Sequence, residues 1–173
     1  MSIKNSKTTL LVAIIFCLGL YNSFSALGAT NPDPVGEDFI RSLRDQVLST
    51  LTPKELSEAE RKSNFEKILD RYFDINRMAR MSLGRYWRKA GKDERNEFIL
   101  QFKAMVVNTY AERFKSYSGE RLAVSGSSKR GRMILVNSEF KKEGEKPIRI
   151  DWRIFGNNDN YKLFDIIIEG VSL

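Results

Sequence analysis

The period of the hydrophobic pattern changes once along this chain, near Gly119, and this change limits the folds open to it. Before Gly119, apolar residues recur every three or four positions, as on one face of a helix. After it they alternate with polar residues, as in half-buried strands, and short turns separate the alternating segments. Such short connections favour antiparallel pairing. The sequence therefore predicts an α+β protein with N-terminal helices packed on a curved four-stranded antiparallel sheet.

Local signals set the expected boundaries. Helix starts are predicted at Asp33-Pro34, at the capping-box pattern Thr52-Pro53-Lys54-Glu55 and at Asp74, and Gly84 interrupts the short third helix. The second helix is expected to run up to Asp74, and the fourth and longest helix to cover residues 93–115. Strands are expected at residues 120–125, 132–141, 147–155 and 161–169, with turns at 126–131, 143–145 and 156–160.

Residues 1–28 have the pattern of a secretory signal peptide. The first nine residues carry Lys4 and Lys7 and no acidic residue, and the apolar run Leu10–Leu20 is too short to span a bilayer. Small residues in Ala26-Leu27-Gly28 then predict cleavage before Ala29. We therefore expect an exported protein whose single domain covers residues 29–173.

Composition excludes several kinds of site. The chain contains no histidine, so Ser-His-Asp catalysis and histidine-bound zinc are excluded, and no metal site is expected. Its one cysteine, Cys17, follows the bulky Phe16, which disfavours lipidation, and it leaves with the signal peptide. Loss of Lys4 and Lys7 leaves 27 basic and 22 acidic residues, a net charge of +5. Anionic lipid headgroups or acidic proteins suit such an exported chain better than nucleic acid.

Two segments carry a likeness to a known family. One is Leu83-Gly84-Arg85-Tyr86-Trp87-Arg88 with the helix that follows it, and the more specific one is Asp165-Ile166-Ile167-Ile168-Glu169-Gly170-Val171-Ser172-Leu173. In order and spacing, the region from about Phe39 to Leu173 resembles the periplasmic phospholipid-binding component of the Mla (maintenance of lipid asymmetry) transport system, also called the toluene-tolerance proteins.

The chain departs from that family at two places. Gly91-Lys92-Asp93 stands where family members have Ser/Thr-Pro at the start of the long helix. Family members also continue beyond the Gly-Val-Ser segment into C-terminal helices, whereas this chain stops at Leu173. We therefore expect a domain that lacks those helices.

The resemblance implies a carrier without catalysis or cofactor, which holds phospholipid acyl chains in an apolar cavity enclosed by the sheet and the helices. Exposing about thirty methylenes to water costs on the order of 20 kcal/mol, so lipid has to cross the periplasm in a dry pocket. The implied partners are an inner-membrane ABC transporter complex and an outer-membrane lipoprotein complex. The residues expected to line the cavity are apolar: Met78, Met81, Phe102, Val106, Tyr110, Ile150, Trp152, Ile154, Ile166, Ile168 and Val171.

A basic cluster accompanies the predicted third helix. A lipid phosphate or an acidic docking partner would suit it. The alternative is a solvated helix face, with one arginine paired to Asp74. The cluster consists of Arg77, Arg80, Arg85, Arg88 and Lys89.

Two other functions stay open on the residues alone. A small cone-like α+β enzyme would use a buried carboxylate as general base, with Tyr86 or Tyr110 as hydrogen-bond donor. Asp165 and Glu169 share a predicted strand face, but four residues of strand separate them by about 13 Å, which favours structural roles. The other function, that of a stalk-like envelope adaptor without a cavity, applies if the C-terminal helices are truly absent.

Overall fold

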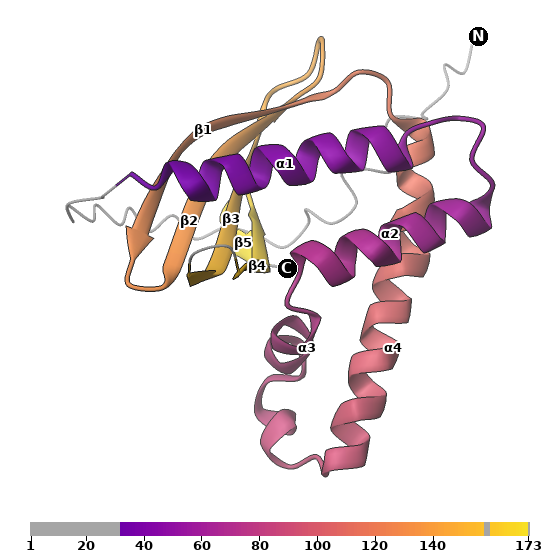
Figure 1. Cartoon of the computed structure of the whole chain (residues 1–173), viewed down its shortest axis with the longest axis vertical. Coiled ribbons are helices and arrows are strands. Elements are labelled where there is room, and N and C mark those ends of the chain that lie inside the picture. Colours follow the sequence, from indigo (N-terminus) through magenta and orange to yellow (C-terminus); the bar gives the residue numbers. More distant parts are fainter. Residues whose placement is uncertain (1–31, 158–159, 173) are drawn as a thin grey trace, which may run out of the picture.

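The structure, a computed structural model, describes residues 32–157 and 160–172 (Figure 1). The predicted signal peptide, residues 1–28, lies outside the described residues. None of the described helices is both long and apolar enough to cross a membrane. In chain order the elements are α1 (Pro34–Leu51), α2 (Glu58–Tyr72), α3 (Ile75–Leu83), the 3-10 helix η1 (Gly84–Arg88), α4 (Lys92–Tyr110), the 3-10 helix η2 (Ala111–Ser116), β1 (Arg121–Arg130), β2 (Met133–Lys141), β3 (Ile148–Asn157), β4 (Asn160–Ile168) and β5 (Val171–Ser172).

Helix α1 begins where the sequence predicts and lies along the sheet. Asp33 is its N-cap, and Asp33 Oδ1 accepts a hydrogen bond from the Gly36 backbone N–H at 3.1 Å. The Asp33 N–H also donates to Ser127 Oγ at 2.8 Å, which fixes the helix start to β1. Glycine at position 36 permits the close approach, because a Cβ there would lie 2.6 Å from Ile134 Cγ2.

Helix α2 begins later than predicted, and the expected cap at Thr52-Pro53-Lys54-Glu55 was wrong. Ser57 caps the helix instead: its Oγ accepts from the Glu60 N–H at 3.2 Å, and Glu60 Oε2 accepts from the Ser57 N–H at 2.9 Å. The Thr52 hydroxyl donates to the Leu48 carbonyl at 2.6 Å. This threonine therefore belongs to the end of α1, and residues 52–57 link the two helices.

Arg61 is fully buried although it is charged. Its guanidinium donates to the carbonyls of Leu51, Pro53 and Leu56, in the last two cases at 3.2 Å. Arg61 Nε lies 3.5 Å from Glu112 Oε1. Arg61 therefore joins three parts of the fold: the end of α1, the segment between α1 and α2, and η2. No sequence pattern had indicated this role.

Helices α3 and α4 extend together toward the lower end of the molecule in Figure 1, away from the sheet. Asp74 caps α3 as predicted, accepting from the Arg77 N–H at 3.0 Å, and Gly84 ends it with φ of 55°. The helix predicted over residues 93–115 is divided into α4 and the 3-10 helix η2. Glu94 Oε2 accepts from the Gly91 N–H at 2.7 Å, so the start of α4 is stabilised without a side-chain cap from Gly91.

The sheet has five strands in the order β1-β2-β3-β4-β5, each antiparallel to the next, and it is open rather than closed into a barrel. The prediction of four strands was therefore wrong. A fifth strand forms because Glu169 and Gly170 adopt φ of 49° and 86°, as a type I′ turn requires, and return the chain onto β4. The turn expected at 126–131 begins too early, since β1 continues to Arg130 past a bulge between Val124 and Gly126.

The buried apolar residues form two clusters rather than one. Helix α1 covers β1 and β2, whereas α2 and α3 reach the sheet at β4. Phe39 and Phe73 pack against both clusters and connect them. The helical cluster contains Leu43, Leu51, Phe65, Ile68, Leu69, Tyr72, Ile75, Val107 and Ala111, and the sheet cluster contains Ile40, Ile134, Val136, Ile154, Tyr161 and Leu163.

Candidate functional site

One face of the sheet is turned toward the helices, and strand register defines which residues lie on it. A Cβ placed on Gly36 of α1 would lie 2.6 Å from Ile134 Cγ2 and 3.3 Å from Val136 Cγ2, so these two residues mark the helix-facing side of β2. Residues opposite them on β3 and β4 share that face. The face consists of three cross-strand rows: Ile134 with Ile154 and Leu163, Val136 with Trp152 and Ile166, and Ser138 with Ile150 and Ile168.

Burial of this face falls from one end of the strands to the other. The row that contains Ile154 is completely buried in the sheet cluster. Trp152, in the second row, and Ile150 and Ile168, in the third, are only half-buried. Val171 of β5 pairs with Ile168 and is 62% exposed. The result is a continuous apolar surface that the helices cover at one end only.

Trp152 contributes apolar surface to this face, although its indole ring carries a polar N–H group. Trp152 Nε1 donates to Ser138 Oγ at 2.8 Å, and the Ser138 hydroxyl donates to the Ile150 carbonyl at 2.8 Å. Ser138 is itself buried. Because the indole N–H has a hydrogen-bond partner within the sheet, it does not require water, and the exposed part of the ring is apolar.

The predicted lining residues on the helices lie at the margin of the helical cluster. They are half-buried and pack against it, except for Met81 of α3, which is 44% exposed. Ile154 of β3, by contrast, has no exposed surface. An enclosed cavity between the helical and sheet residues remains a prediction. The half-buried helical residues are Met78, Phe102, Val106 and Tyr110.

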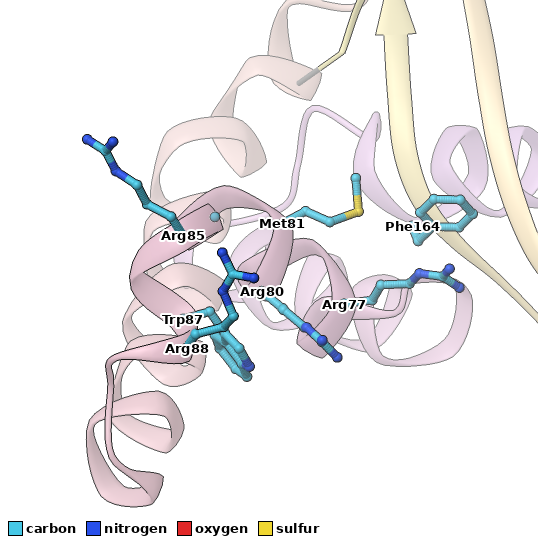
Figure 2. Close-up of a pocket in the computed structure, with 8 residues that line it drawn as sticks. Arg77, Arg80, Met81, Arg85, Trp87, Arg88 and Phe164 are labelled. Carbon is cyan, nitrogen blue, oxygen red and sulfur yellow. The ribbon is translucent and has the colours of Figure 1, made fainter.

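A groove of about 620 Å³ lies elsewhere, where α3 and η1 meet β4 (Figure 2). In Figure 2, Arg77 and Met81 extend from α3 toward Phe164, whereas Arg85 points away. Four of the five residues of the predicted basic cluster line the groove, and Lys89 does not. The lining residues are Arg77, Arg80, Met81, Gly84, Arg85, Trp87, Arg88 and Phe164.

Two of the four arginines that line this groove, Arg77 and Arg85, lie over aromatic rings rather than against carboxylates. The Arg77 guanidinium carbon lies 4.1 Å from the ring centre of Phe164 and 4.4 Å from that of Phe155. Asp74, which the alternative interpretation pairs with one of these arginines, accepts from the Arg77 backbone N–H instead. Within residues 32–157 and 160–172, none of the arginines that line the groove forms an ion pair. Their charge is therefore available to an anion.

Sequence reasoning assigned no groove role to Trp87 or Phe164. Trp87 stands between arginines in the Arg85-Tyr86-Trp87-Arg88 motif, so an aromatic residue in a basic cluster was the available signal. The groove role of Phe164 could not be predicted from a sequence pattern of this kind. The pairing of β3 with β4 shifts between Arg153 and Ile154, so Phe164 is the extra residue of a bulge and leaves the strict alternation of the strand.

Of the three carboxylates that are buried among the described residues, Asp151 and Asp165 lie on the opposite face of the sheet, and Asp33 caps α1 and pairs with Lys129 at 2.9 Å. Asp165 is fully buried, and its two oxygens contact Arg153 Nη1 and Ser172 Oγ, each at 2.8 Å. Asp151 forms an ion pair with Arg149 at 2.7 Å, and this hydrogen bond raises the pKa of Arg149 above its ordinary value. The described residues contain no cluster of three or more acidic or cysteine side chains placed to hold a metal.

Glu169 also has a structural role. The prediction that it shares a strand face with Asp165 was wrong. It lies in the turn between β4 and β5, and its Oε1 accepts from the Arg149 backbone N–H at 2.6 Å. This carboxylate thus fixes the turn to β3.

Comparison with known proteins agrees with this architecture. The curated "Intermembrane phospholipid transport system binding protein MlaC" of Haemophilus influenzae is 22% identical over 107 residues, which are 59% of this chain and 50% of that protein. The chain thus spans about half the length of this curated relative. A solved structure of a phospholipid-binding protein from Ralstonia solanacearum, in complex with a phospholipid, has a similar fold: the TM-score is 0.68 at 20% identity, with 78% of each chain covered.

The model of the family described as MlaC protein matches residues 41–173. This region contains α2, α3, α4, the whole sheet and most of α1. It also contains both the partly covered apolar face of the sheet and the basic groove. The chain therefore belongs to the MlaC protein family.

Proposed function

We propose that this protein is a periplasmic phospholipid carrier, which shuttles lipid between the inner and outer membranes and so maintains outer-membrane lipid asymmetry. The observation that carries the proposal is the decline in burial along the helix-facing side of the sheet, from Ile154 at 0% exposed to Val171 at 62% exposed. A folded protein rarely leaves the apolar face of a sheet uncovered unless something binds there. Acyl chains match that surface in chemistry.

The half-buried residues of the two clusters suit a lipid site better than the fully buried ones. Trp152 and Ile166 pack on the sheet cluster, whereas Phe102 and Val106 pack on the helical cluster. Each side chain already has support on one side and keeps apolar surface for a ligand on the other. Each methylene placed against such surface contributes about 0.8 kcal/mol, so a two-chain lipid gains many such increments.

The pairing of the buried carboxylates with basic side chains favours binding without catalysis. The enzyme alternative needs a buried carboxylate that is free to accept a proton inside an apolar site. Asp151 and Asp165 are hydrogen-bonded to arginines and lie on the face away from the helices. This arrangement favours a carrier over an isomerase-like or hydratase-like enzyme. The named relatives, one a transport-system binding protein and the other phospholipid-bound, support the same choice.

The remaining parts of the proposal concern location and partners. Export by a cleaved signal peptide, residues 1–28, would deliver the domain to the periplasm, and N-terminal sequencing of the secreted protein tests it: the chain should begin at about Ala29. Recovery of an uncleaved, membrane-embedded precursor would contradict export. The proposed partners are an inner-membrane ABC transporter complex and an outer-membrane lipoprotein complex, and the "intermembrane" transport system named for the relative supports this choice.

The basic cluster serves docking rather than retention of lipid in this proposal. Arg80, Arg85, Arg88 and Lys89 are exposed to solvent. A solvated cation gains little from a headgroup that water already stabilises, but it steers association with an anionic surface.

Native mass spectrometry of the secreted protein tests the carrier function directly. The protein should purify with one or more phospholipids bound, and organic extraction should release them. A clean lipid-free mass, together with turnover of a small substrate, would favour the enzyme. A lipid-free mass without turnover would favour the adaptor.

A further inference from the structure

Residues 75–92, which we call the α3–α4 tip, form a strongly basic segment. They contain six lysine and arginine residues and no acidic residue, in a chain whose formal net charge is +7. In the part of the chain that the structure describes, none of these six side chains forms an ion pair, whereas basic residues elsewhere, such as Arg41 and Lys103, do. The tip therefore presents positive charges that are not held in ion pairs among the described residues, which favours an anionic surface.

The tip also exposes aromatic and apolar side chains among these charges. Tyr86 is 54% exposed and Met81 44% exposed. Trp87 is half-buried, lines the groove and lies under the guanidinium of Arg95, whose carbon is 5.4 Å from the ring centre. Tyrosine and tryptophan prefer the boundary between headgroups and acyl chains, and neighbouring lysine and arginine residues bind lipid phosphates. This composition matches a bilayer surface.

The position of the tip suits such a contact. Figure 1 shows the connection between α3 and α4 at the lower end of the molecule, remote from the sheet. The groove begins at this tip and reaches Phe164 of β4. Two residues further along the same strand, Ile166 belongs to the apolar face proposed to bind acyl chains. A lipid whose phosphate is bound at the arginines would therefore lie between the bilayer and that apolar face.

We propose that the α3–α4 tip docks directly on an anionic phospholipid bilayer, with Arg80, Arg85 and Arg88 on lipid phosphates and Tyr86 at headgroup depth. The inference rests on the proposed function in one respect, because docking would serve lipid transfer to and from the apolar face. An acidic protein segment would satisfy the arginines but offers no boundary for the exposed aromatic ring, so the bilayer is the better match.

Co-sedimentation of the secreted protein with vesicles tests docking. Vesicles containing phosphatidylglycerol should bind the protein, vesicles of phosphatidylcholine alone should not, and added salt should weaken binding. The double variant Arg85→Glu with Arg88→Glu should lose about tenfold or more in affinity at low salt. Tyr86→Ser should weaken binding without a change in charge. Circular dichroism checks that each variant folds.

Matched controls lie on other elements: between α1 and α2, between β2 and β3, and in α1. Lys54→Glu with Lys146→Glu makes the same change in net charge at two exposed positions, and Val35→Ser removes a 51% exposed apolar side chain from the first turn of α1. Both controls should bind as the wild type does. If the Lys54 and Lys146 variant loses as much affinity as the tip variant, net charge alone explains binding and the proposal is overturned.

One further result would overturn the docking proposal, namely a wild-type protein that does not bind phosphatidylglycerol vesicles at low salt. If that protein binds poly-glutamate, the tip recognises an acidic protein segment instead. Native mass spectrometry of the same preparations distinguishes this failure from failure of the carrier function. Lipid-loaded protein that ignores vesicles contradicts docking only, and lipid-free protein that binds them contradicts the carrier only.

Discussion

Val171→Glu places a carboxylate on the helix-facing side of the sheet where that side is most exposed. Val171 pairs with Ile168 on β4, and 62% of its surface is open to solvent. Full burial of a valine contributes about 1.5 kcal/mol or somewhat more, so the buried part of Val171 contributes below about 1 kcal/mol. The free energy of unfolding should fall by no more than that amount, because water can still solvate the new carboxylate in the lipid-free protein.

An acyl chain laid against the same face would change this balance. The carboxylate would then lose its water, or it would have to bind a proton. Full burial raises the pKa of a glutamate by up to about 3–5 units, at about 1.4 kcal/mol per unit, and a position at the margin of the site should experience part of that. A penalty of about 3 kcal/mol weakens lipid binding more than a hundredfold. The variant should therefore fold and purify without phospholipid.

Native mass spectrometry and circular dichroism measure the two effects separately. Val171→Leu should fold and retain lipid, because it keeps the surface apolar. Val35→Glu makes the same substitution at a 51% exposed valine in the first turn of α1, so it should also retain lipid. A Val171→Glu protein with its full complement of lipid would refute the placement of acyl chains here. Loss of the folded spectrum would instead assign Val171 to the packed core.

Three further predictions concern stability. Arg61→Met should lower the free energy of unfolding by about 3 kcal/mol in urea titrations, because it removes the buried partner of Glu112 and of three carbonyls; an unchanged midpoint would contradict this. Gly36→Ala should destabilise by about 1–3 kcal/mol through overpacking against the sheet, although alanine favours helices; a stabilised variant would show that the contact relaxes freely. Burial alone would raise the pKa of Asp33, but hydrogen bonds from Lys129 and from the Gly36 N–H have a larger opposite effect, and the pKa lies below its ordinary value. The stability contributed by ionised Asp33 is then fully present above about pH 4 and lost as the pH falls through the lowered pKa. Lys129→Met should therefore be less stable at neutral pH and lose less stability on acidification, and parallel pH profiles of thermal unfolding for the two proteins would count against the pairing.

Local signals in the sequence predicted the class of fold and the order of its elements. The change of period near Gly119 separates helices from strands, because periods of 3.6 and 2 residues follow from backbone geometry alone. Asp33 and Asp74 were identified as caps because a cap bonds to a backbone N–H within three residues. Where two such patterns lay close together, at Thr52 and Ser57, local reasoning chose the wrong one.

Pairing between strands was harder to predict. The segment beyond Gly126 has the composition of a turn, yet it continues β1 because β2 supplies partners across a bulge. Strand β5 exists because Glu169 adopts a positive φ that its type disfavours, and the ladder with β4 stabilises the pair. Neither feature follows from the residues within a few positions.

For the candidate site, the sequence determined which residues share a face, and the tertiary structure decided how far each is covered. Ile154 and Trp152 alternate along one strand in the same pattern, yet the first is fully buried and the second half-buried. The sequence likewise identified the basic cluster, but only the fold brought Phe164 to Arg77 and left those arginines without carboxylate partners among the described residues. The physical reason is that periodicity records the direction of a side chain, whereas burial and pairing depend on elements that lie far away in the chain.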